Sequence, residues 1–193
     1  MITNGYCTIQ QVKDALRISD AVDDSLLELS IEAASREIDA YCQRVFYSTT
    51  ATREFVTDSN FVVQIDDLVS LTSLKTSTNR LWETTWGATD YQLEPTNGIA
   101  GGLVQPYTRI RAVGNYYFPA QLEASVQVTG VFGWSAIPLD VRMACILQAQ
   151  RLFKRFDSPL GVLGMGDLGT IRVSRVDSDV QALLAPYMKV TYA

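Results

Sequence analysis

The sequence predicts an α+β fold, in which a small bundle of three main helices carries a β-rich insertion between its second and third helices and ends in a flexible C-terminal arm. Three observations support this prediction. Apolar residues recur at helical spacing near both ends of the chain, short β-branched and aromatic segments fill the middle, and glycines cluster near residue 160. We expect one domain at residues 1–157, with the insertion at 45–133, followed by a glycine-rich loop and arm at 158–193.

The first helix is predicted at residues 8–17. Thr8 and Gln11 have the spacing of a capping box, in which the hydroxyl accepts from a backbone N–H and the glutamine side chain reaches back to the cap. These features indicate a short amphipathic helix. Its apolar stripe comprises Ile9, Val12, Ala15 and Leu16.

The second and most regular helix is predicted at residues 24–43. Asp23 and Asp24 lie where the helix dipole favours negative charge, and Ser25 with Glu28 offers a second capping box. Because the helix has one apolar stripe, it must bury that stripe against other helices. The stripe comprises Leu27, Ile31, Ala34, Ile38 and Tyr41.

The region from residue 45 to 133 has the residue pattern of strands. Its short segments are rich in β-branched and aromatic residues and are separated by turn-forming residues. We expect an antiparallel meander or a small barrel. The segments are 52–57, 60–66, 71–77, 80–86, 90–95, 108–114 and 124–132.

The stretch VTGVFGWSAIP at 128–138 predicts a corner between the insertion and the third helix. Gly130 and Gly133 permit a close backbone approach or a positive φ, and we expect Trp134 to fill the seam between the β region and the bundle. Pro138 suits the first turn of a helix, where its missing N–H removes no hydrogen bond. We interpret these four residues as a rigid structural hinge.

The third helix is predicted at 138–156. The cations Arg151, Lys154 and Arg155 near its end indicate a solvated helix terminus that the dipole favours, with a role at a protein interface as the alternative. Its apolar stripe comprises Val141, Cys145, Ala149, Leu152 and Phe156.

The last part of the chain has weaker signals. Residues 170–176 have the pattern of a strand, and Asp177 has the position of a cap for a short helix at 177–186. The apolar and aromatic tail after Pro186 has no evident place within the fold. Disorder and docking into a partner are both compatible with it.

Composition disfavours several classes of function. The chain has no histidine, which removes the commonest general base and a common metal ligand, and its net charge of −5 disfavours a broad grip on nucleic-acid phosphates. Cys7, Cys42 and Cys145 lack metal-site or disulfide spacing, so we expect buried free thiols. No leader or membrane-spanning run is evident. We expect a non-enzymatic protein, made in the cytoplasm, without cofactor, metal or membrane partner.

Two alternative functions are suggested by residue types. Trp82, Trp86 and Trp134 suggest a small-ligand or carbohydrate-binding module, although tryptophan in a small β-rich region is more often part of the core. The second alternative is a hydrolase that works without histidine.

Two carboxylate pairs and one glycine loop are the candidate chemical groups for such an enzyme. The pairs Asp23/Asp24 and Asp66/Asp67 are explained more simply by a helix start and a turn. The loop at 158–169 has G-x-x-G-x-G but follows a helix, precedes a strand and lacks a lysine, which indicates a linker rather than a nucleotide site.

The order of the motifs resembles the head–tail connector proteins of tailed bacteriophages, also called adaptor or head-completion proteins. The resemblance begins with Y-x-T-x-x-x-V-K-x-x-L at Tyr6–Leu16 and DDSLLELSIEAASREIDAYCQRVF at Asp23–Phe46. It spans about residues 1–157, identified on this basis as a connector domain, and is loose beyond them. Further matching motifs are T-x-x-F at Thr52–Phe55, D-D-L-x-S-L at Asp66–Leu71, D-Y-x-L-x-P at Asp90–Pro95, V-x-V-T-G-x-F-G-W-x-x-I-P at Val126–Pro138 and V-x-x-L-L-x-P-Y at Val180–Tyr187.

The resemblance implies a structural virion protein at the head–tail junction. Such proteins form a ring, usually of twelve copies, that joins the portal to the next tail-side component and extends the DNA channel. We expect a chain that is monomeric when free, with an acidic balance that lets DNA pass without specific binding. The resemblance also implies that the C-terminal segment contacts the portal. The candidate portal-binding residues are Val180, Leu183, Leu184, Tyr187, Val190 and Tyr192.

Overall fold

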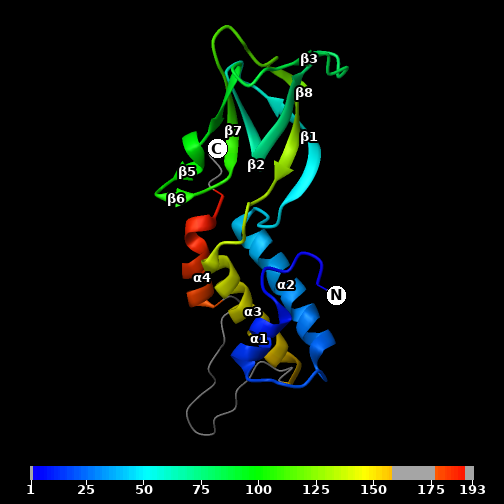
Figure 1. Cartoon of the computed structure of the whole chain (residues 1–193), viewed down its shortest axis with the longest axis vertical. Coiled ribbons are helices and arrows are strands. Elements are labelled where there is room, and N and C mark those ends of the chain that lie inside the picture. The colour runs from blue at the N-terminus through cyan, green and yellow to red at the C-terminus, as the bar shows by residue number, and fades with distance from the viewer. Residues whose placement is uncertain (1, 158–176, 190–193) are drawn as a thin grey trace. The chain divides into compact units, whose positions relative to one another are not determined.

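The computed structural model describes residues 2–157 and 177–189, and the chain forms two compact units (Figure 1). A helical unit contains residues 1–44 and 137–193, and a β unit contains residues 45–136. The presence of both helices and an antiparallel sheet confirms the α+β class. The glycine-rich loop and the strand expected at 170–176 lie outside the described residues.

The helical unit is built on two long helices that are far apart in the sequence. α2 packs along α3, α1 contacts both of them, and α4 packs against α3 (Figure 1). Within the described residues, no helix is long and apolar enough to cross a lipid bilayer. The elements are α1 (Ile9–Leu16), α2 (Asp24–Cys42), α3 (Leu139–Asp157) and α4 (Ser178–Leu184), followed by the 3-10 turn η2 (Ala185–Tyr187).

The predicted capping box of α1 is confirmed, whereas that of α2 is wrong. The Gln11 N–H donates to Thr8 Oγ1 at 3.2 Å, and the Thr8 N–H donates to Gln11 Oε1 at 2.9 Å. α2 has Asp23 at its N-cap, without a hydrogen bond from the capping side chain. Because the helix already begins at Asp24, Ser25 lies inside the first turn and cannot act as the cap.

The apolar stripes of α2 and α3 form the core of the helical unit. Four of the five predicted α2 residues are buried, and Tyr41 is half-buried. On α3 the predicted stripe is buried for its first three residues, but Phe156 is 53% exposed and Phe153 is buried instead. Phe156 lies instead on the surface beside Leu29 and Ala33 of α2. The main core residues are Tyr6, Val12, Leu27, Ile31, Ala34, Ile38, Val141, Ala144, Cys145, Ala149 and Phe153.

The three cysteines are buried free thiols, as predicted. Cys7 Sγ lies 3.3 Å from Cys145 Sγ, so the thiols make a weak hydrogen bond that joins the N-terminal segment to α3. That hydrogen bond, together with burial, raises the pKa of Cys7 well above its ordinary value. Both thiols therefore serve the packing of the core.

The β unit contains an antiparallel sheet whose strand order differs from the order in the sequence. The main path is β1-β8-β2-β7-β4, with β3 paired to β2, and β5 and β6 form a separate hairpin. The antiparallel pairing is confirmed, but a simple meander is not formed because β8 lies between β1 and β2. The strands are β1 (Thr49–Thr57), β2 (Val62–Thr76), β3 (Thr84–Thr85), β4 (Tyr91–Glu94), β5 (Ile99–Ala100), β6 (Leu103–Val104), β7 (Tyr107–Ala112) and β8 (Gln121–Phe132).

The length of β2 explains this order. Its first half pairs with β7, for example Val63 with Ile110, and its second half pairs with β8, for example Leu74 with Val128. Register shifts between the paired stretches bend the strand, as β-bulges do. Both halves of β2 contribute to one apolar core, which comprises Val63, Ile65, Leu68, Leu74, Trp86, Ile110, Phe118, Val126, Val128 and Phe132.

Two glycines on and after β8 lie against neighbouring backbone. A Cβ at Gly130 would lie 2.2 Å from the Ser70 carbonyl oxygen of β2. Gly133 has a φ of 103°, and a Cβ there would lie 2.0 Å from the Tyr47 carbonyl oxygen. Both positions therefore require glycine. At Gly130 a side chain has no room, and at Gly133 it has no room and the positive φ is also unfavourable for other residues.

Gly133→Ala should lower the free energy of unfolding by about 3 kcal/mol or more, because the methyl group meets backbone and the φ is unfavourable for alanine. Gly114→Ala is a matched control: its φ is 69°, but no atom lies within 4 Å of the added Cβ. That variant should lose only about 1 kcal/mol. Urea denaturation of both variants measures the difference. Equal losses would show that the contact with Tyr47 has no effect.

Cys42 gives the helical unit a dependence on pH. Burial raises the pKa of its thiol from 9.0 to about 11. Between these values the unfolded chain loses the proton while the folded chain keeps it, so stability declines as pH rises. In Cys42→Ala this decline should be smaller by about 1.4 kcal/mol per pH unit over that window. Thermal or urea unfolding of both proteins from pH 8 to 11 tests this, and parallel curves would contradict it.

Candidate functional site

The C-terminal segment forms the helix that its sequence predicts. The Asp177 side chain accepts from the Asp179 N–H at 3.1 Å, and the Gln181 N–H donates to the Asp177 carbonyl oxygen at 3.0 Å. Pro186 then falls in η2, where the helix tightens and ends. The cap and the proline therefore define both ends of this short element.

The apolar side of this segment packs within the chain itself. Val180, Leu184 and Tyr187 are buried, with exposures of 2%, 1% and 6%, and Leu183 is half-buried. The sequence predicted a flexible arm that does not pack on its own chain, and the structure differs from that prediction for these residues. The reason is that α4 lays its stripe against α3, which offers it an apolar surface. Val190 and Tyr192, the other two candidates, lie outside the described residues.

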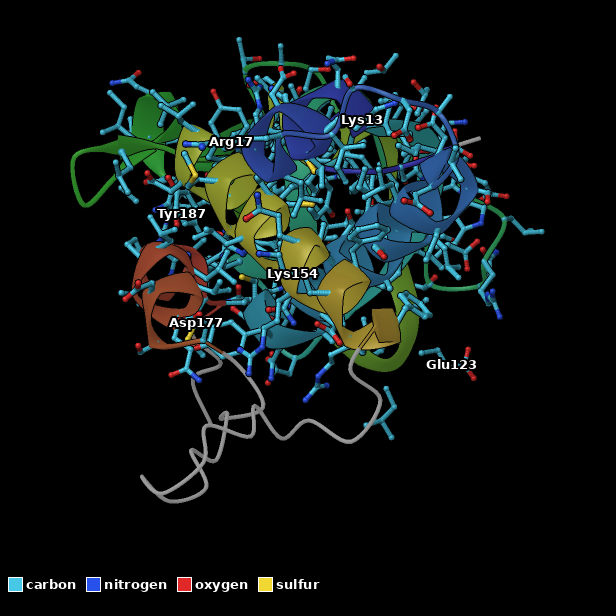
Figure 2. The ribbon with its side chains drawn as sticks, turned by 90° about the horizontal axis from the view of Figure 1, so that it is seen from below. Lys13, Arg17, Glu123, Lys154, Asp177 and Tyr187 are labelled. Atoms are coloured by element: carbon cyan, nitrogen blue, oxygen red, sulfur yellow. The ribbon has the colours of Figure 1, made fainter. Side chains whose placement is uncertain are left out.

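Two polar contacts hold the end of the segment on the helical unit. The Tyr187 hydroxyl donates to Asp140 Oδ2 on α3 at 3.1 Å, and the Lys189 N–H donates to the Cys42 carbonyl oxygen at the end of α2 at 2.9 Å. Burial, together with the Asp140 carboxyl, raises the pKa of the Tyr187 hydroxyl. Figure 2 labels Asp177 at the start of this docked segment and Tyr187 near its end. Residues 177–189 thus have a defined intramolecular position.

The residues interpreted as a hinge fall into both units. Gly130, Gly133 and Trp134 belong to the β unit, and Pro138 belongs to the helical unit, one residue before α3. The Trp134 side chain is buried, its Nε1–H donates to Asp67 Oδ2 at 3.1 Å, and its ring lies 5.2 Å from that of Phe46. Trp134 therefore closes the end of the β unit, and its role as a hinge stays a prediction.

The carboxylate pairs serve the structure. Asp24 binds Lys13 Nζ at 2.7 Å, and Asp66 binds Arg53 Nη1 at 2.7 Å. Asp67 is buried beneath Trp134, and the two pairs belong to different units. Across residues 2–157 and 177–189, no three histidine, cysteine or acidic residues are grouped so that they could hold a metal ion.

Two of the three tryptophans belong to the core of the β unit. Trp86 stacks on Phe118 with ring centroids 4.7 Å apart, and its Nε1–H donates to Thr76 Oγ1 at 2.9 Å. Trp134 is buried as described, whereas Trp82 is half-buried. The interpretation of Trp86 and Trp134 as core residues is confirmed, so these rings offer no open face to a ligand.

One surface feature was not predicted. A groove of about 460 Å³ lies between α2 and α3, lined by Leu29, Ser30, Ala33, Leu152, Arg155 and Phe156. The sequence places Phe156 in the core stripe, so only the packing of α3 shows that it is exposed. The sequence does contain one indication of this groove. Leu29 and Ala33 are one helical turn apart on α2 and lie outside its main apolar stripe, so they form a second apolar strip on that helix.

Residues 6–89 match the family model of phage gp6-like head–tail connector proteins. No curated protein matches the sequence. The resemblance noted from the motifs is therefore confirmed by a family model over the N-terminal part of the chain.

Solved structures share the fold over nearly the whole chain. A chain from the virion of a native gene transfer agent (GTA) particle has a TM-score of 0.62 and 16% identity, and covers 100% of this chain and 94% of its own. A chain from the neck of an empty GTA particle, computed with C6 symmetry, has a TM-score of 0.61 and 18% identity. One from the neck of a native GTA particle, computed with C12 symmetry, has a TM-score of 0.60 and 17% identity. The last two cover 96% of this chain and 90% of their own.

Tyr187→Phe should loosen the docked segment without unfolding the protein. Loss of the hydroxyl's hydrogen bond weakens docking by about 1 kcal/mol, so hydrogen exchange of residues 178–189 should accelerate about fivefold. Exchange in α2 should not change. Tyr117→Phe, at a tyrosine 61% exposed in the β unit, is the matched control. Unchanged exchange at 178–189 would show that the Asp140 contact does not hold the segment.

Proposed function

We propose that this phage-type head–tail connector is a structural virion protein that forms a ring at the head–tail junction, joins the portal to the next tail-side component and extends the DNA channel. The observation that carries the proposal is the connector-family match at residues 6–89, together with a fold shared over almost the whole chain with neck proteins of GTA particles. The C12 symmetry of one of those necks supports a ring of twelve copies.

The chemistry of the described residues supports a structural role. Of the four candidate carboxylates, Asp24 and Asp66 are bound to cations, Asp67 is buried beneath Trp134, and Asp23 lies at the N-cap position of α2. The net charge of −5 suits a channel wall, because like charge lets DNA phosphates pass without adhesion. We infer that the protein works through the contacts between its copies and its neighbours.

The C-terminal segment is the proposed portal contact, and its docked state limits how that contact can form. Val180, Leu184 and Tyr187 are already buried, so they reach a portal only if α4 leaves α3. Leu183 and Met188 remain accessible while α4 is docked, with Met188 44% exposed. Two modes follow: the docked segment offers Leu183 and Met188 together with residues 190–193, or the whole segment is released.

Mixing the protein with its cognate portal and counting joined copies by electron microscopy tests the function. The full chain should add a ring to the portal. A truncation after Lys189 removes Val190 and Tyr192 but leaves the docked helix, whereas a truncation after Asp157 removes the helix as well. Loss in both truncations supports contact through the last four residues, and loss only in the longer truncation supports contact through α4.

Two outcomes would contradict the proposal. A full chain that never joins the portal ring would overturn the function itself. If both truncated chains join as well as the full chain, the C-terminal segment is not the portal contact. Circular dichroism of each truncation checks that α1, α2 and α3 remain folded.

A further inference from the structure

The thiols of Cys7 and Cys145 bring together two segments that are far apart in the sequence. Cys7 lies two residues before α1, and Cys145 lies within α3. Both are free thiols, and their sulfur atoms are 3.3 Å apart. Since the sulfurs of a disulfide are about 2.0 Å apart, each would need to move by only about 0.6 Å. The pair therefore needs little rearrangement to form a covalent bond.

The segment before α1 holds Cys7 in this position. The Tyr6 side chain is buried, and its hydroxyl donates to the Asp39 carboxylate of α2. The Tyr6 N–H donates to Ser35 Oγ, also on α2, at 3.0 Å. Because these contacts fix the residue next to Cys7, its thiol meets Cys145 at a high effective concentration.

Cys145 is the more nucleophilic member of the pair. The hydrogen bond from the Cys7 thiol, together with the backbone of Tyr6 and Cys7, lowers the pKa of Cys145 in spite of its burial. The thiolate is the form of cysteine that reacts with oxidants. Cys42 differs, because burial raises the pKa of its thiol to about 11. The three cysteines are therefore not equivalent, and Cys145 should react first.

Oxidation of this pair requires the segment before α1 to open. Cys7 is 6% exposed and Cys145 is 0% exposed, so the closed form shields both sulfurs from solvent. Residues 2–7 form neither helix nor strand, and such segments open at a lower free energy than the helices on which they pack. Opening exposes the Cys145 sulfur to a small oxidant, and closing returns Cys7 to it.

We propose that Cys7 and Cys145 form an intramolecular disulfide when the protein leaves the reducing cytoplasm, with a peroxide as the oxidant. The Cys145 thiolate attacks one peroxide oxygen, the O–O bond breaks, and Cys145 becomes a sulfenic acid while hydroxide leaves and takes up the thiol proton. The Cys7 sulfur then attacks the Cys145 sulfur and expels the second hydroxyl, which leaves as water with the Cys7 proton. Two thiols are oxidised and one peroxide is reduced to two waters.

The disulfide would fix the start of α1 on α3. It closes a loop that contains α2 and the whole β unit, and cross-links that close long loops stabilise a fold most. The reduced chain can open its N-terminal segment during assembly, whereas the oxidised chain cannot. The change of surroundings, from cytoplasm to released particle, rests on the proposed virion role, but the chemistry of the pair does not.

Hydrogen peroxide treatment of the free protein tests the proposal. Remaining thiols are alkylated in denaturant, and the disulfide is located by non-reducing peptide mapping. Two of the three thiols should be lost as one Cys7–Cys145 link. Cys42 should react at least about tenfold more slowly. The thermal midpoint of the oxidised protein should rise by about 5 °C or more, and dithiothreitol should reverse the rise.

Two variants separate this pair from general thiol oxidation. In Cys7→Ala the link and the rise in midpoint should both be lost, and dimedone should label Cys145, because no second thiol displaces its hydroxyl. Cys42→Ala is the matched control, which removes a buried thiol but should keep the link and the rise. The peptide map of the parent protein needs no variant, so it decides the proposal even if Cys7→Ala folds poorly.

Four results would overturn the proposal. They are a link that involves Cys42, disulfides only between chains, Cys7 and Cys145 still unlinked after Cys42 has reacted, and a Cys7–Cys145 link that leaves the thermal midpoint unchanged. Because the free protein is used without a portal, these results are independent of whether the chain joins a portal ring.

Discussion

Neither α2 nor α3 can bury its apolar stripe alone, and the contact between them determines where the rest of the helical unit lies. The two helices are separated by the whole β unit in sequence, so their pairing must close a long loop before it gains any burial. Once it is formed, α1 and α4 have surfaces to pack on, and the N-terminal segment is joined to α3 through Cys7 and Cys145. The exposed groove lies along the same seam.

The sequence predicts the features that depend on local chemistry. Thr8 and Gln11 define the start of α1, Asp177 defines the start of α4, and the spacing of Leu27, Ile31, Ala34 and Ile38 identifies the buried side of α2. The sequence also predicts that residues 45–133 form antiparallel strands, because short β-branched segments between turn residues are typical of such strands. Gly130 and Gly133 predict that the chain comes close to a neighbouring segment, and in the structure that neighbour is main chain at both positions.

The features that were not predicted depend on partners distant in sequence. The stripe of Val180, Leu184 and Tyr187 is equally suited to the chain's own α3 and to another protein, and only the fold shows that α3 is available. The order of the sheet depends on how β2 divides its pairing between β7 and β8, which no local signal specifies. Phe156 continues the spacing of the α3 stripe, yet α2 no longer covers it at that point. The sequence therefore identifies the apolar residues of α4 but not the surface against which they pack.

The corner after β8 limits which substitutions the chain can accept there. At Gly133 the obstacle is the main chain of Tyr47, and at Gly130 it is the main chain of Ser70, so no substitution of a neighbouring side chain can make room. The requirement for glycine at these positions therefore comes from the path of the backbone. The fold that these two contacts support is shared with GTA proteins at only 16–18% sequence identity.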